Sequence, residues 1–532
     1  MRFRIGINLG DVIQEGEQIY GDGVNIAARI EGLVEGGGIC ISRSAYDQVK
    51  NKLPIGYQYL GEHQVKNIKD PVRVYRVLME RESAGKVIGE KRVKKRLTLL
   101  AATVLFAVVV GAAAGVWHSY FRPPPIEPAS VEKMAFPVPD KPSIAVLPFN
   151  NLSGDPKQEY FSDGLTEEII AALGRIPKLF VIARNSTFTY KGKPVKVQRV
   201  SEELGVRYVL EGSVKKAGDK IRVTAQLIDA LDGHHLWAER YDRNLKDIFA
   251  VQDEITKEII TAMQVKLTEG EQARATAKGT NNLDAYLKCL QANEYMLRIN
   301  PESNALGKQL AEEAIVLDPG YAWAYSILGR GHMQEVWVGM SKSPKQSIAK
   351  AIELLQKALV LDDTLAETHS ILGFLYSMTS EHEKGVARAE KAVALNPNSA
   401  WTQMMLGKTL SFSSRWEESI PPYKKAIRLN PIPPNMYLWS LGLSYAYMEQ
   451  YEEAITWCEK AIHQQPDSLS AHIMMAVVYS LSGREEGARI EAAEILRIQS
   501  KFSLKKFEKK VTFKKKEDRE KLIGALRKAG LA

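Results

Sequence analysis

The 532-residue chain has little cysteine, which limits the covalent and metal chemistry open to it. Its three cysteines, Cys40, Cys289 and Cys458, stand far apart in sequence. Metal-ligand motifs and disulfide frameworks place cysteines at short or regular spacings, and this chain has no such spacing. We therefore expect three isolated free thiols.

Signatures of nucleic-acid binding are also missing, although the formal net charge is +9. From Arg497 to Lys528 the chain has 13 lysines and arginines and 4 acidic residues, so this tail alone carries a surplus of nine. A second basic cluster, Lys86 to Arg96, lies beside an apolar segment. No zinc-finger or RNA-recognition motif accompanies the charge, so we expect no nucleic-acid partner. The basic tail, residues 501–532, is expected to cap the helices before it.

Long apolar runs are rare, and the one exception predicts a transmembrane helix. Residues 97–117 contain no charge, and a helix of this length spans roughly 30 Å, the thickness of a bilayer's hydrocarbon core. A basic juxtamembrane segment, residues 81–96, precedes it, and a proline-rich linker, residues 118–140, follows. The positive-inside rule then predicts a single-pass protein of the inner (cytoplasmic) membrane, with a cytoplasmic amino terminus and an extracytoplasmic remainder.

Helical repeats are predicted for residues 283–500. Similar phrases end at Pro319, Asp363, Pro397, Pro431 and Pro466. Their spacings are 44, 34, 34 and 35 residues, and 34 is the tetratricopeptide period. The longer step predicts a ten-residue insertion around Val338 to Gln346. The stretch resembles the tetratricopeptide family, which implies an α-solenoid whose concave face binds a protein or peptide partner.

Two kinds of residue refine the repeat prediction. Small residues, such as Ala426 and Ala461, stand where two helices of a hairpin must approach closely. Two large aromatic residues, Trp401 and Trp439, either line the concave face or pack between helices.

Residues 141–268 predict a compact α/β domain. The apolar run SIAVLPF indicates a buried strand, and a helix follows with Ser162 or Asp163 as its cap. Further strands flank a turn at Gly218-Asp219, and a helix closes the domain. The phrases IAVLPF, YFSDGLTEEI, VIARNST and VRYVLEGSV resemble the TolB-like amino-terminal domain of bacterial envelope proteins. That resemblance implies a binding domain with no known reaction.

Two polar pairs in this domain have simple structural interpretations. His234 and His235 are adjacent, but no further ligands stand at supportive spacing, so we expect a strand-end pair and no metal site. Asp163 and Glu167 lie four residues apart at the predicted start of a helix, where favourable placement against the helix dipole is sufficient to explain them.

The first 80 residues carry the strongest chemical signal. They predict a strand, a glycine-rich entry into a helix, a second strand, a helix and a closing pair of strands. The motif from Val24 to Arg29, the strand from Gly37 to Ser42 and the segment from Lys66 to Tyr75 resemble the carboxyl-terminal half of class III adenylate/guanylate cyclase domains. The resemblance implies a partial cyclase domain, residues 1–80, that works as a homodimer.

Asn25 and Arg29 match the active-site asparagine and arginine of that family. Four residues apart, they project from one helical face. The amide can orient a ribose oxygen, and the guanidinium can neutralise charge on the transferring phosphoryl group. Gln18 stands where adenylate cyclases usually carry an aspartate that binds the purine, so the choice between ATP and GTP stays open.

The metal-binding half of the cyclase domain is missing from this sequence. The resemblance implies Mg²⁺ or Mn²⁺, but the two aspartates that bind metal in the family belong to the half that would precede Met1. We therefore expect the chain as written to be inactive, and to act on a nucleoside triphosphate only if the domain is completed. A truncated gene, an incomplete sequence and a start codon placed too late are all open explanations. An isolated half-domain should also expose apolar sheet edges.

The predicted fold class is multidomain α/β plus all-α. It comprises a partial cyclase domain, one transmembrane helix, a TolB-like α/β domain and a tetratricopeptide α-solenoid. The preferred functional hypothesis is a membrane-anchored signalling protein of the cyclase family with an extracytoplasmic sensing region. The alternative is a non-catalytic envelope scaffold that binds proteins through its repeats and carries an inert cyclase remnant.

Overall fold

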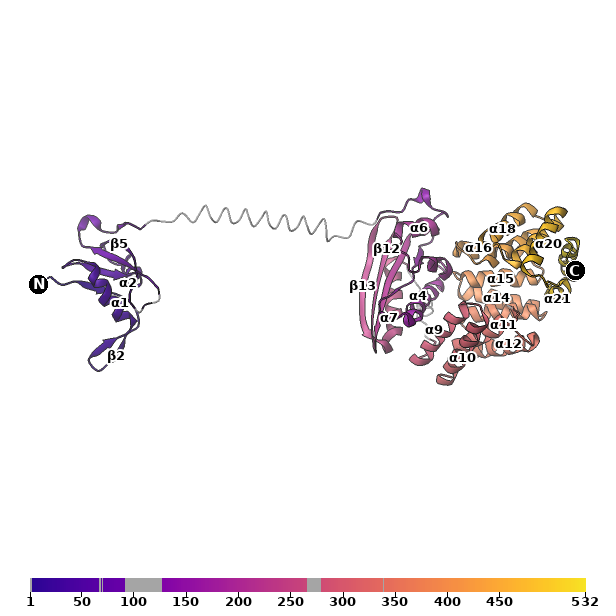
Figure 1. Ribbon diagram of the computed structural model, residues 1–532, viewed down its shortest axis with the longest axis horizontal. Coiled ribbons are helices and arrows are strands. Elements are labelled where there is room, and N and C mark those ends of the chain that lie inside the picture. Colours follow the sequence, from indigo (N-terminus) through magenta and orange to yellow (C-terminus); the bar gives the residue numbers. More distant parts are fainter. Residues whose placement is uncertain (1, 67, 69, 91–126, 266–278, 338) are drawn as a thin grey trace. The chain divides into compact units, whose positions relative to one another are not determined.

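A computed structural model describes residues 2–66, 68, 70–90, 127–265, 279–337 and 339–532. The chain divides into two compact units, Met1–Pro123 and Pro124–Ala532 (Figure 1). The first unit is α/β, and the second joins an α/β domain to an array of helical repeats.

A five-stranded mixed sheet with the order β1-β4-β6-β5-β7 forms the first unit. β1 (Ile5–Ile7) runs parallel to β4 (Ile39–Ser42), and β5 (Gly56–His63) runs parallel to β7 (Val87–Ile88). Between them, β6 (Val72–Leu78) is antiparallel to both of its neighbours. Because β7 pairs with β5, the sheet continues beyond residue 80 into the segment predicted to be a basic juxtamembrane segment.

Two helices, α1 (Asp22–Ile30) and α2 (Arg43–Val49), cover opposite faces of this sheet. The consecutive residues Cys40 and Ile41 point to opposite faces; Cys40 packs with Ile30 of α1, and Ile41 packs with the α2 side. A hairpin of β2 (Ile13–Glu15) and β3 (Gln18–Tyr20) precedes α1.

The α/β domain of the second unit contains a six-stranded sheet. Its path is β10-β8-β11-β12-β13, and β9 pairs with β11. β8, β10 and β11 are parallel, whereas β12 and β13 continue the sheet as antiparallel strands. The strands are β8 (Ser143–Val146), β9 (Asn150–Asn151), β10 (Phe180–Val181), β11 (Tyr208–Ala217), β12 (Lys220–Asp229) and β13 (His234–Asn244).

Helices cover both faces of this second sheet. α4 (Glu159–Gly174) and α7 (Ile248–Ala262) pack on one face, and α6 (Val197–Leu204) packs on the other. The sequence-based prediction of the α4 cap is wrong. The helix begins one turn earlier, with Gln158 as its N-cap residue, because Asp155 and Pro156 start a 3-10 turn that leads directly into it.

Six antiparallel helix pairs form the repeat array. The pairs are α9 (Leu283–Leu297) with α10 (Pro301–Leu317), α11 (Ala322–Trp337) with α12 (Pro344–Leu361), α13 (Ala366–Met378) with α14 (His382–Leu395), α15 (Ala400–Phe412) with α16 (Trp416–Leu429), α17 (Asn435–Tyr447) with α18 (Tyr451–Gln464), and α19 (Leu469–Leu481) with α20 (Glu485–Ile498). Close helix approach explains the small residues: a Cβ on Gly442 would lie 2.7 Å from the sulfur of Cys458.

The ten extra residues of the second pair are spread over three places. α11 has 16 residues and α12 has 18, whereas the next pair, α13 and α14, has 13 and 14. The connection between α11 and α12 is also three residues longer than that between α13 and α14. The insertion therefore lengthens both helices as well as the loop, and only part of it lies around Val338 to Gln346.

The basic tail packs against the last repeats, as expected for a cap. It forms α21 (Leu504–Glu508) and α22 (Lys516–Lys528). Leu522 and Leu526 of α22 are buried in the same apolar cluster as α19. Between these two helices, the ring of Phe513 packs edge-on against Trp416, with centroids 5.1 Å apart. The tail thus contacts the last repeats through apolar side chains, although most of its residues are charged or polar.

The predicted fold class is wrong in one element, the transmembrane helix. The predicted span, residues 97–117, lies outside the described residues. Within the described parts of the chain, no helix combines the length and the apolar character needed to cross a membrane. α12, the longest described helix, carries Lys345, Lys350, Glu353 and Lys357, and each buried charge at a bilayer centre costs about 2.5–3.5 kcal/mol or more. The described fold is mixed α/β with helical repeats, and the predicted single-pass inner-membrane localisation is contradicted with it.

The repeat packing makes a direct prediction about stability. Ala426 in α16 is fully buried, so Ala426→Phe should overpack the helix crossing and lower the free energy of unfolding by about 1–3 kcal/mol. Ala387 in α14 is exposed, so Ala387→Phe is the matched control and should change little. Urea denaturation of the full chain measures both; equal midpoints for Ala426→Phe and the unmodified protein would contradict the helix register.

Candidate functional site

The entry to α1 is built from the loop that follows β1. Asn8 donates from Nδ2 to the carbonyl oxygen of Gly23 at 3.2 Å, and Ser44 donates from Oγ to the carbonyl oxygen of Leu9 at 2.9 Å. The loop thereby joins the first turns of α1 and α2. A Cβ on Gly23 would lie 2.8 Å from the carbonyl oxygen of Asp11, so this close approach requires glycine.

The two residues matched to the cyclase motif lie on the outer face of α1. Asn25 and Arg29 are exposed, whereas Ile26 and Ile30, one position further along, pack toward the core of the unit. Among the described residues, neither Asn25 nor Arg29 forms a side-chain hydrogen bond or an ion pair. The helix therefore presents an amide and a guanidinium together to solvent. Gln18 is exposed on β3, which contacts α1.

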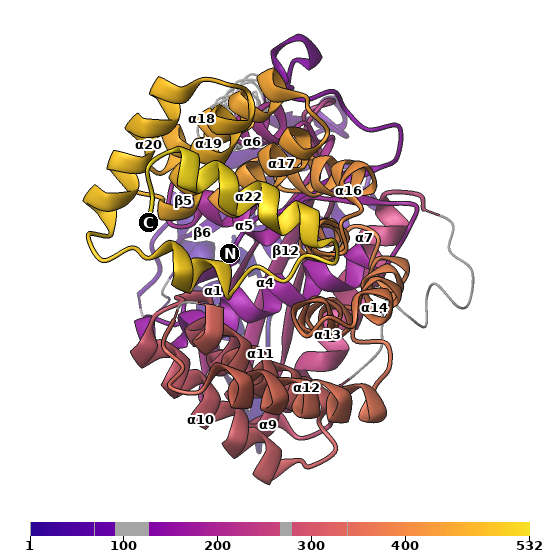
Figure 2. The same cartoon turned by 90° about the vertical axis from the view of Figure 1, so that its right-hand side faces the viewer.

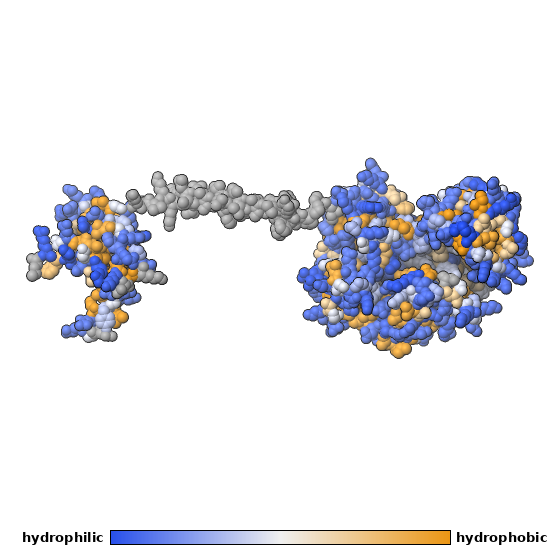
Figure 3. Space-filling model, in the orientation of Figure 1, coloured by the Kyte–Doolittle hydropathy of each residue, from blue (hydrophilic) through white to orange (hydrophobic). Residues whose placement is uncertain are grey.

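Apolar side chains remain exposed beside this helix, as expected for half of a domain. β1 is an edge strand, and both Ile5 and Ile7 are 45% exposed. We call the apolar residues of β1, its flanks and the β2–β3 hairpin the edge patch; they are Phe3, Ile5, Ile7, Leu9, Val12, Ile13 and Ile19. Figure 3 shows apolar surface on this unit. Surface of this kind usually marks a site of contact.

The expected divalent metal finds no site in the described part of the chain. No group of three or more His, Cys, Asp or Glu side chains in those residues is arranged to hold a metal ion. His234 and His235 are exposed at the start of β13, in agreement with the predicted strand-end pair. The described residues thus do not fit the Mg²⁺ or Mn²⁺ implied by the cyclase resemblance, and the metal requirement stays a prediction.

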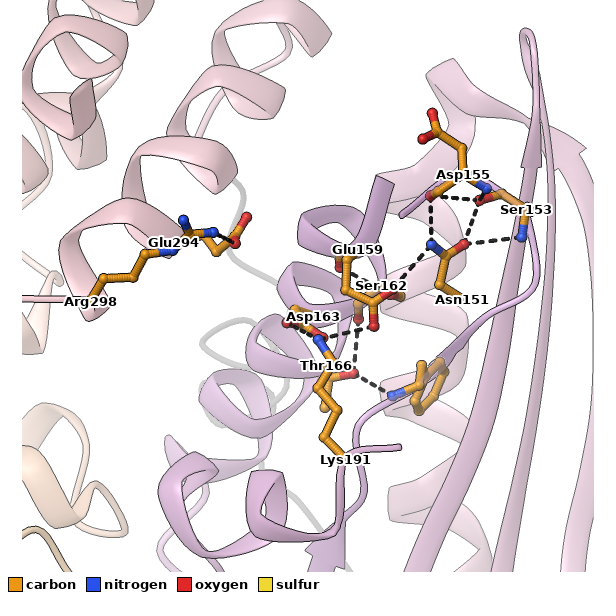
Figure 4. A network of polar contacts seen from close by, with 11 residues as sticks. Asn151, Ser153, Asp155, Glu159, Ser162, Asp163, Thr166, Lys191, Glu294 and Arg298 are labelled. Carbon is orange, nitrogen blue, oxygen red and sulfur yellow. Dashed lines mark hydrogen bonds and ion pairs between the residues drawn. The ribbon is translucent and has the colours of Figure 1, made fainter. Parts of the chain in front are cut away.

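Asp163 belongs to a structural network on the first two turns of α4 (Figure 4). Its carboxylate lies 2.5 Å from Nζ of Lys191, which also pairs with Glu159 at 3.0 Å. Asn151 donates from Nδ2 to Glu159 at 3.1 Å and thereby ties the helix to β9. Burial raises the pKa of Asp163, and Lys191 opposes this shift. The carboxylate is buried and paired, and its role is to hold α4 in place.

The repeats curve around α4 and α5 (Arg184–Thr187), so the α/β domain occupies the inner side of the array (Figure 2). Hydrogen bonds join the two parts. Asn398 donates from Nδ2 to the carbonyl oxygen of Ile176 at 2.8 Å. The amide of Ala183 donates to the carbonyl oxygen of Leu429 at 2.8 Å. The concave face predicted to bind a partner is thus covered in part by the chain's own α/β domain.

Arg428, near the end of α16, makes the densest of these contacts. Its guanidinium donates to the carbonyl oxygens of Pro137 and Gly205 at 2.9 Å and of Leu204 at 3.2 Å. Burial lowers the pKa of Arg428 to about 10, because it removes water from around the charged guanidinium. Nearby, Ser186 donates to Asn430 at 2.5 Å and accepts from the amide of Ile432 at 2.8 Å.

A cavity of about 910 Å³ lies between the α/β domain and the repeats. α4, α5 and α7 line one side, and the first helices of the repeats, α9, α11, α13, α15, α17 and α19, line the other. Trp401 and Trp439 are half-buried and line this cavity, as do Trp323 and Trp337. The sequence left two positions open for these tryptophans, the concave face or the space between helices. The structure places both Trp401 and Trp439 on the concave side.

One part of the cavity wall carries a cluster of charged and polar side chains. Glu167 pairs with Arg184 and accepts a hydrogen bond from Nδ2 of Asn293 at 2.7 Å. Arg330 donates to the other side of the same amide and lies 3.9 Å from Glu367. Burial raises the pKa of Glu167 to about 7 against the opposing effect of Arg184. The helix dipole is therefore an insufficient explanation of Glu167, which lies in the third turn of α4.

Lys408 is the cavity residue that sequence reasoning missed. It lies on α15 and is 5% exposed. Its ammonium nitrogen is 4.1 Å from the ring centroid of Trp337, 4.8 Å from Phe374 and 5.8 Å from Trp439. Burial lowers the pKa of Lys408 to about 7, although the aromatic faces attract the charged form. One feature of the sequence indicates this residue: Lys408 is the only charged residue in the predicted helix AWTQMMLGKTLSF.

Comparisons with known proteins relate parts of the chain to other proteins. Residues 140–258 match the family described as HilA/YgeH-like transcriptional regulator, second domain, and residues 437–468 match the tetratricopeptide repeat. A Rhizobium meliloti protein named "Putative adenylate cyclase 3" is 40% identical over 377 residues, which are 70% of this chain and 57% of the relative. The chain thus spans little more than half the length of this curated relative.

Two solved structures are also similar to parts of the chain. An adenylate/guanylate cyclase/hydrolase from Silicibacter pomeroyi is 40% identical over 14% of this chain and 46% of its own, with a TM-score of 0.14. YrrB, described as a TPR protein with an unusual peptide-binding site, is 20% identical over 36% of this chain and 93% of its own, with a TM-score of 0.27.

These comparisons support a cyclase-like chain with tetratricopeptide repeats. The family matched by residues 140–258 has a different description from the TolB-like resemblance, which stays a prediction. That the first unit is a partial cyclase domain, with Asn25 and Arg29 in its active site, also stays a prediction.

The buried lysine predicts a specific pH dependence of stability. The unfolded chain keeps the Lys408 proton up to about pH 10.5, whereas the folded chain releases it near pH 7. Between these values the unfolded state binds more protons, so the free energy of unfolding should rise with pH, by at most about 1.4 kcal/mol per pH unit. Lys408→Met removes this contribution, so the difference between the two proteins isolates it. Urea denaturation at pH 7, 8 and 9 measures that difference; parallel profiles would show that the aromatic faces keep the ammonium at its ordinary pKa.

Proposed function

We propose that this chain is a cyclase-related signalling protein whose first unit supplies half of a class III nucleotide cyclase active site. The observation that carries the proposal is the exposed pair on α1, Asn25 and Arg29, above a glycine-built loop. The similarity to a relative named as an adenylate cyclase supports it. The substrate would be a nucleoside triphosphate and the product a cyclic nucleotide.

Each side chain has a distinct task in this proposal. The Asn25 amide would hydrogen-bond a ribose oxygen and hold the attacking hydroxyl in line with the phosphoryl group. The Arg29 guanidinium would neutralise negative charge as it develops on that group, an interaction that strengthens in the transition state. Divalent metal, when bound by a complementary half, supplies stabilisation of the attacking and leaving oxygens.

The edge patch gives the complementary half a place to dock. β1 has one unpaired edge, and the apolar side chains around it are solvent-exposed. Pairing with a further strand would give the backbone N–H and C=O groups of this edge hydrogen-bond partners. It would also bury apolar area, which stabilises the contact by roughly 25 cal/mol for each Å² buried. A homodimer, as implied by the cyclase resemblance, would then bring two such sites together. The choice between ATP and GTP rests on the environment of Gln18.

The second candidate function is a non-catalytic scaffold that binds a protein or peptide. The tetratricopeptide match over residues 437–468 favours this candidate, since such repeats suggest protein binding. The α/β domain already occupies part of the concave side, so a protein partner would use surface outside the contacts of Asn398 and Arg428. The two candidates differ in whether the first unit takes part in catalysis.

Complementation tests the catalytic proposal. The full chain, assayed alone with Mg²⁺ or Mn²⁺, should make no cyclic nucleotide, because its described residues hold no metal-binding cluster. Adding the metal-binding half of a related cyclase should create metal-dependent activity. Arg29→Ala should then lower turnover roughly 100-fold or more, and Asn25→Ala should act similarly, while nucleotide affinity changes much less.

A matched substitution separates catalysis from general effects of lost charge. Arg81 is exposed in the same unit, so Arg81→Ala removes a guanidinium without touching α1 and should leave turnover unchanged. Circular dichroism must show that every variant is folded. Normal turnover by the complemented Arg29→Ala protein would contradict the role of Arg29, and activity of the chain alone would refute the argument from missing metal ligands.

A further inference from the structure

The cavity between the α/β domain and the repeats has the properties of a small-molecule site. Its volume of about 910 Å³ lies within the usual range for ligand pockets, and its wall comes from two parts of the chain. Four tryptophans line it, together with tyrosines and many polar and charged side chains. The tryptophans offer apolar surface to the body of a ligand, and the polar side chains can bind its head group.

Lys408 introduces a buried positive charge without a counter-ion. Among the described residues, no carboxylate pairs with its ammonium, whose contacts are aromatic rings and the sulfur of Met436 at 3.5 Å. Fully buried lysines are almost always paired, because an isolated charge loses its hydration. The ring faces compensate part of this loss, and an anion would compensate the remainder.

Other polar atoms on the same wall are also without partners. Nε1 of Trp401 and Oε1 of Gln334 are buried and make no hydrogen bond with the described residues. Both residues line the cavity. Trp401 and Lys408 are seven residues apart on α15, so they share a face roughly 10 Å apart along the helix. The cavity therefore offers a cation at one point and an indole N–H two turns away.

Five acidic residues also line the cavity: Glu167, Glu168, Asp253, Asp362 and Glu367. Glu167 is paired with Arg184 and Asn293, and Glu367 lies near Arg330. Among the described residues, none of these carboxylates pairs with Lys408, so its charge stays uncompensated. The site thus favours an anionic group at Lys408 over a cationic one.

We propose that this cavity binds a small amphipathic organic anion, with its carboxylate or equivalent group on Lys408 and its apolar body against the tryptophans. The ligand would contact both the α/β domain and the repeats, so binding would strengthen their association. The proposal stands independently of any cyclase activity in the first unit.

Three probes of equal length test the charge preference. Decanoate, decanol and decylammonium share a ten-carbon chain but differ in the charge of the head group. Titration calorimetry with the full chain at pH 7 should give 1:1 binding of decanoate, at least 10-fold tighter than decanol. Decylammonium should bind weakest. Equal affinity for decanoate and decanol, or a preference for the cation, would overturn the proposal.

Substitutions locate the site. Lys408→Met keeps an unbranched apolar side chain but removes the charge, and should weaken decanoate at least 10-fold while changing decanol less than about 2-fold. Lys408→Arg should retain the preference for the anion. Lys357 is exposed on α12, so Lys357→Met serves as the matched control and should behave as the unmodified protein. An undiminished preference for decanoate in folded Lys408→Met would place the anion elsewhere and refute the assignment.

Discussion

The second unit depends on the burial of one guanidinium against backbone carbonyls. Arg428 lies one residue before the end of α16 and donates to three carbonyl oxygens of the α/β domain. Hydrogen bonds from a charged donor are worth about 1.5–3 kcal/mol each, and removing such a donor leaves the buried acceptors unsatisfied. With Ser186, Asn398 and Asn430, this residue turns two domains that sequence treats as separate into one compact body.

This association determines what the repeats can do. An isolated array would offer its whole concave face to a partner, whereas here α4 and α5 face that side and enclose a cavity against it. Lys408, Trp401 and Trp439 acquire their surroundings from the enclosure. The chemistry of the cavity is therefore a property of the assembled second unit, separate from the role proposed for Asn25 and Arg29 in the first.

Local pattern predicted the repeats well because each helix pair packs mainly on its neighbours. The 34-residue period and the small residues Ala426 and Ala461 were sufficient, as both alanines are fully buried. The sequence did not predict the contacts between the repeats and the α/β domain. Arg428 and Asn430, which make them, occur in the phrase AIRLNP, and this phrase has the pattern of an ordinary repeat end. Ser162 and Asp163 misled the α4 assignment, since good capping residues also occur inside helices when other groups satisfy them. Here Lys191 pairs with Asp163, and Ser162 donates to the carbonyl oxygen of Glu159. On α1, spacing alone placed Asn25 and Arg29 on one face, but no pattern in one chain establishes what binds there.

Hydrogen exchange at the contact between the α/β domain and the repeats tests this account most directly. The amides of Ala183 and Ile432 donate across the contact, to Leu429 and Ser186. If the two parts form one unit in solution, both amides should exchange as slowly as amides in the central strand β11 and should open only with the whole unit. Exchange of Ala183 and Ile432 as fast as that of exposed loop amides, such as those around Gly192, would show that the α/β domain and the repeats move independently.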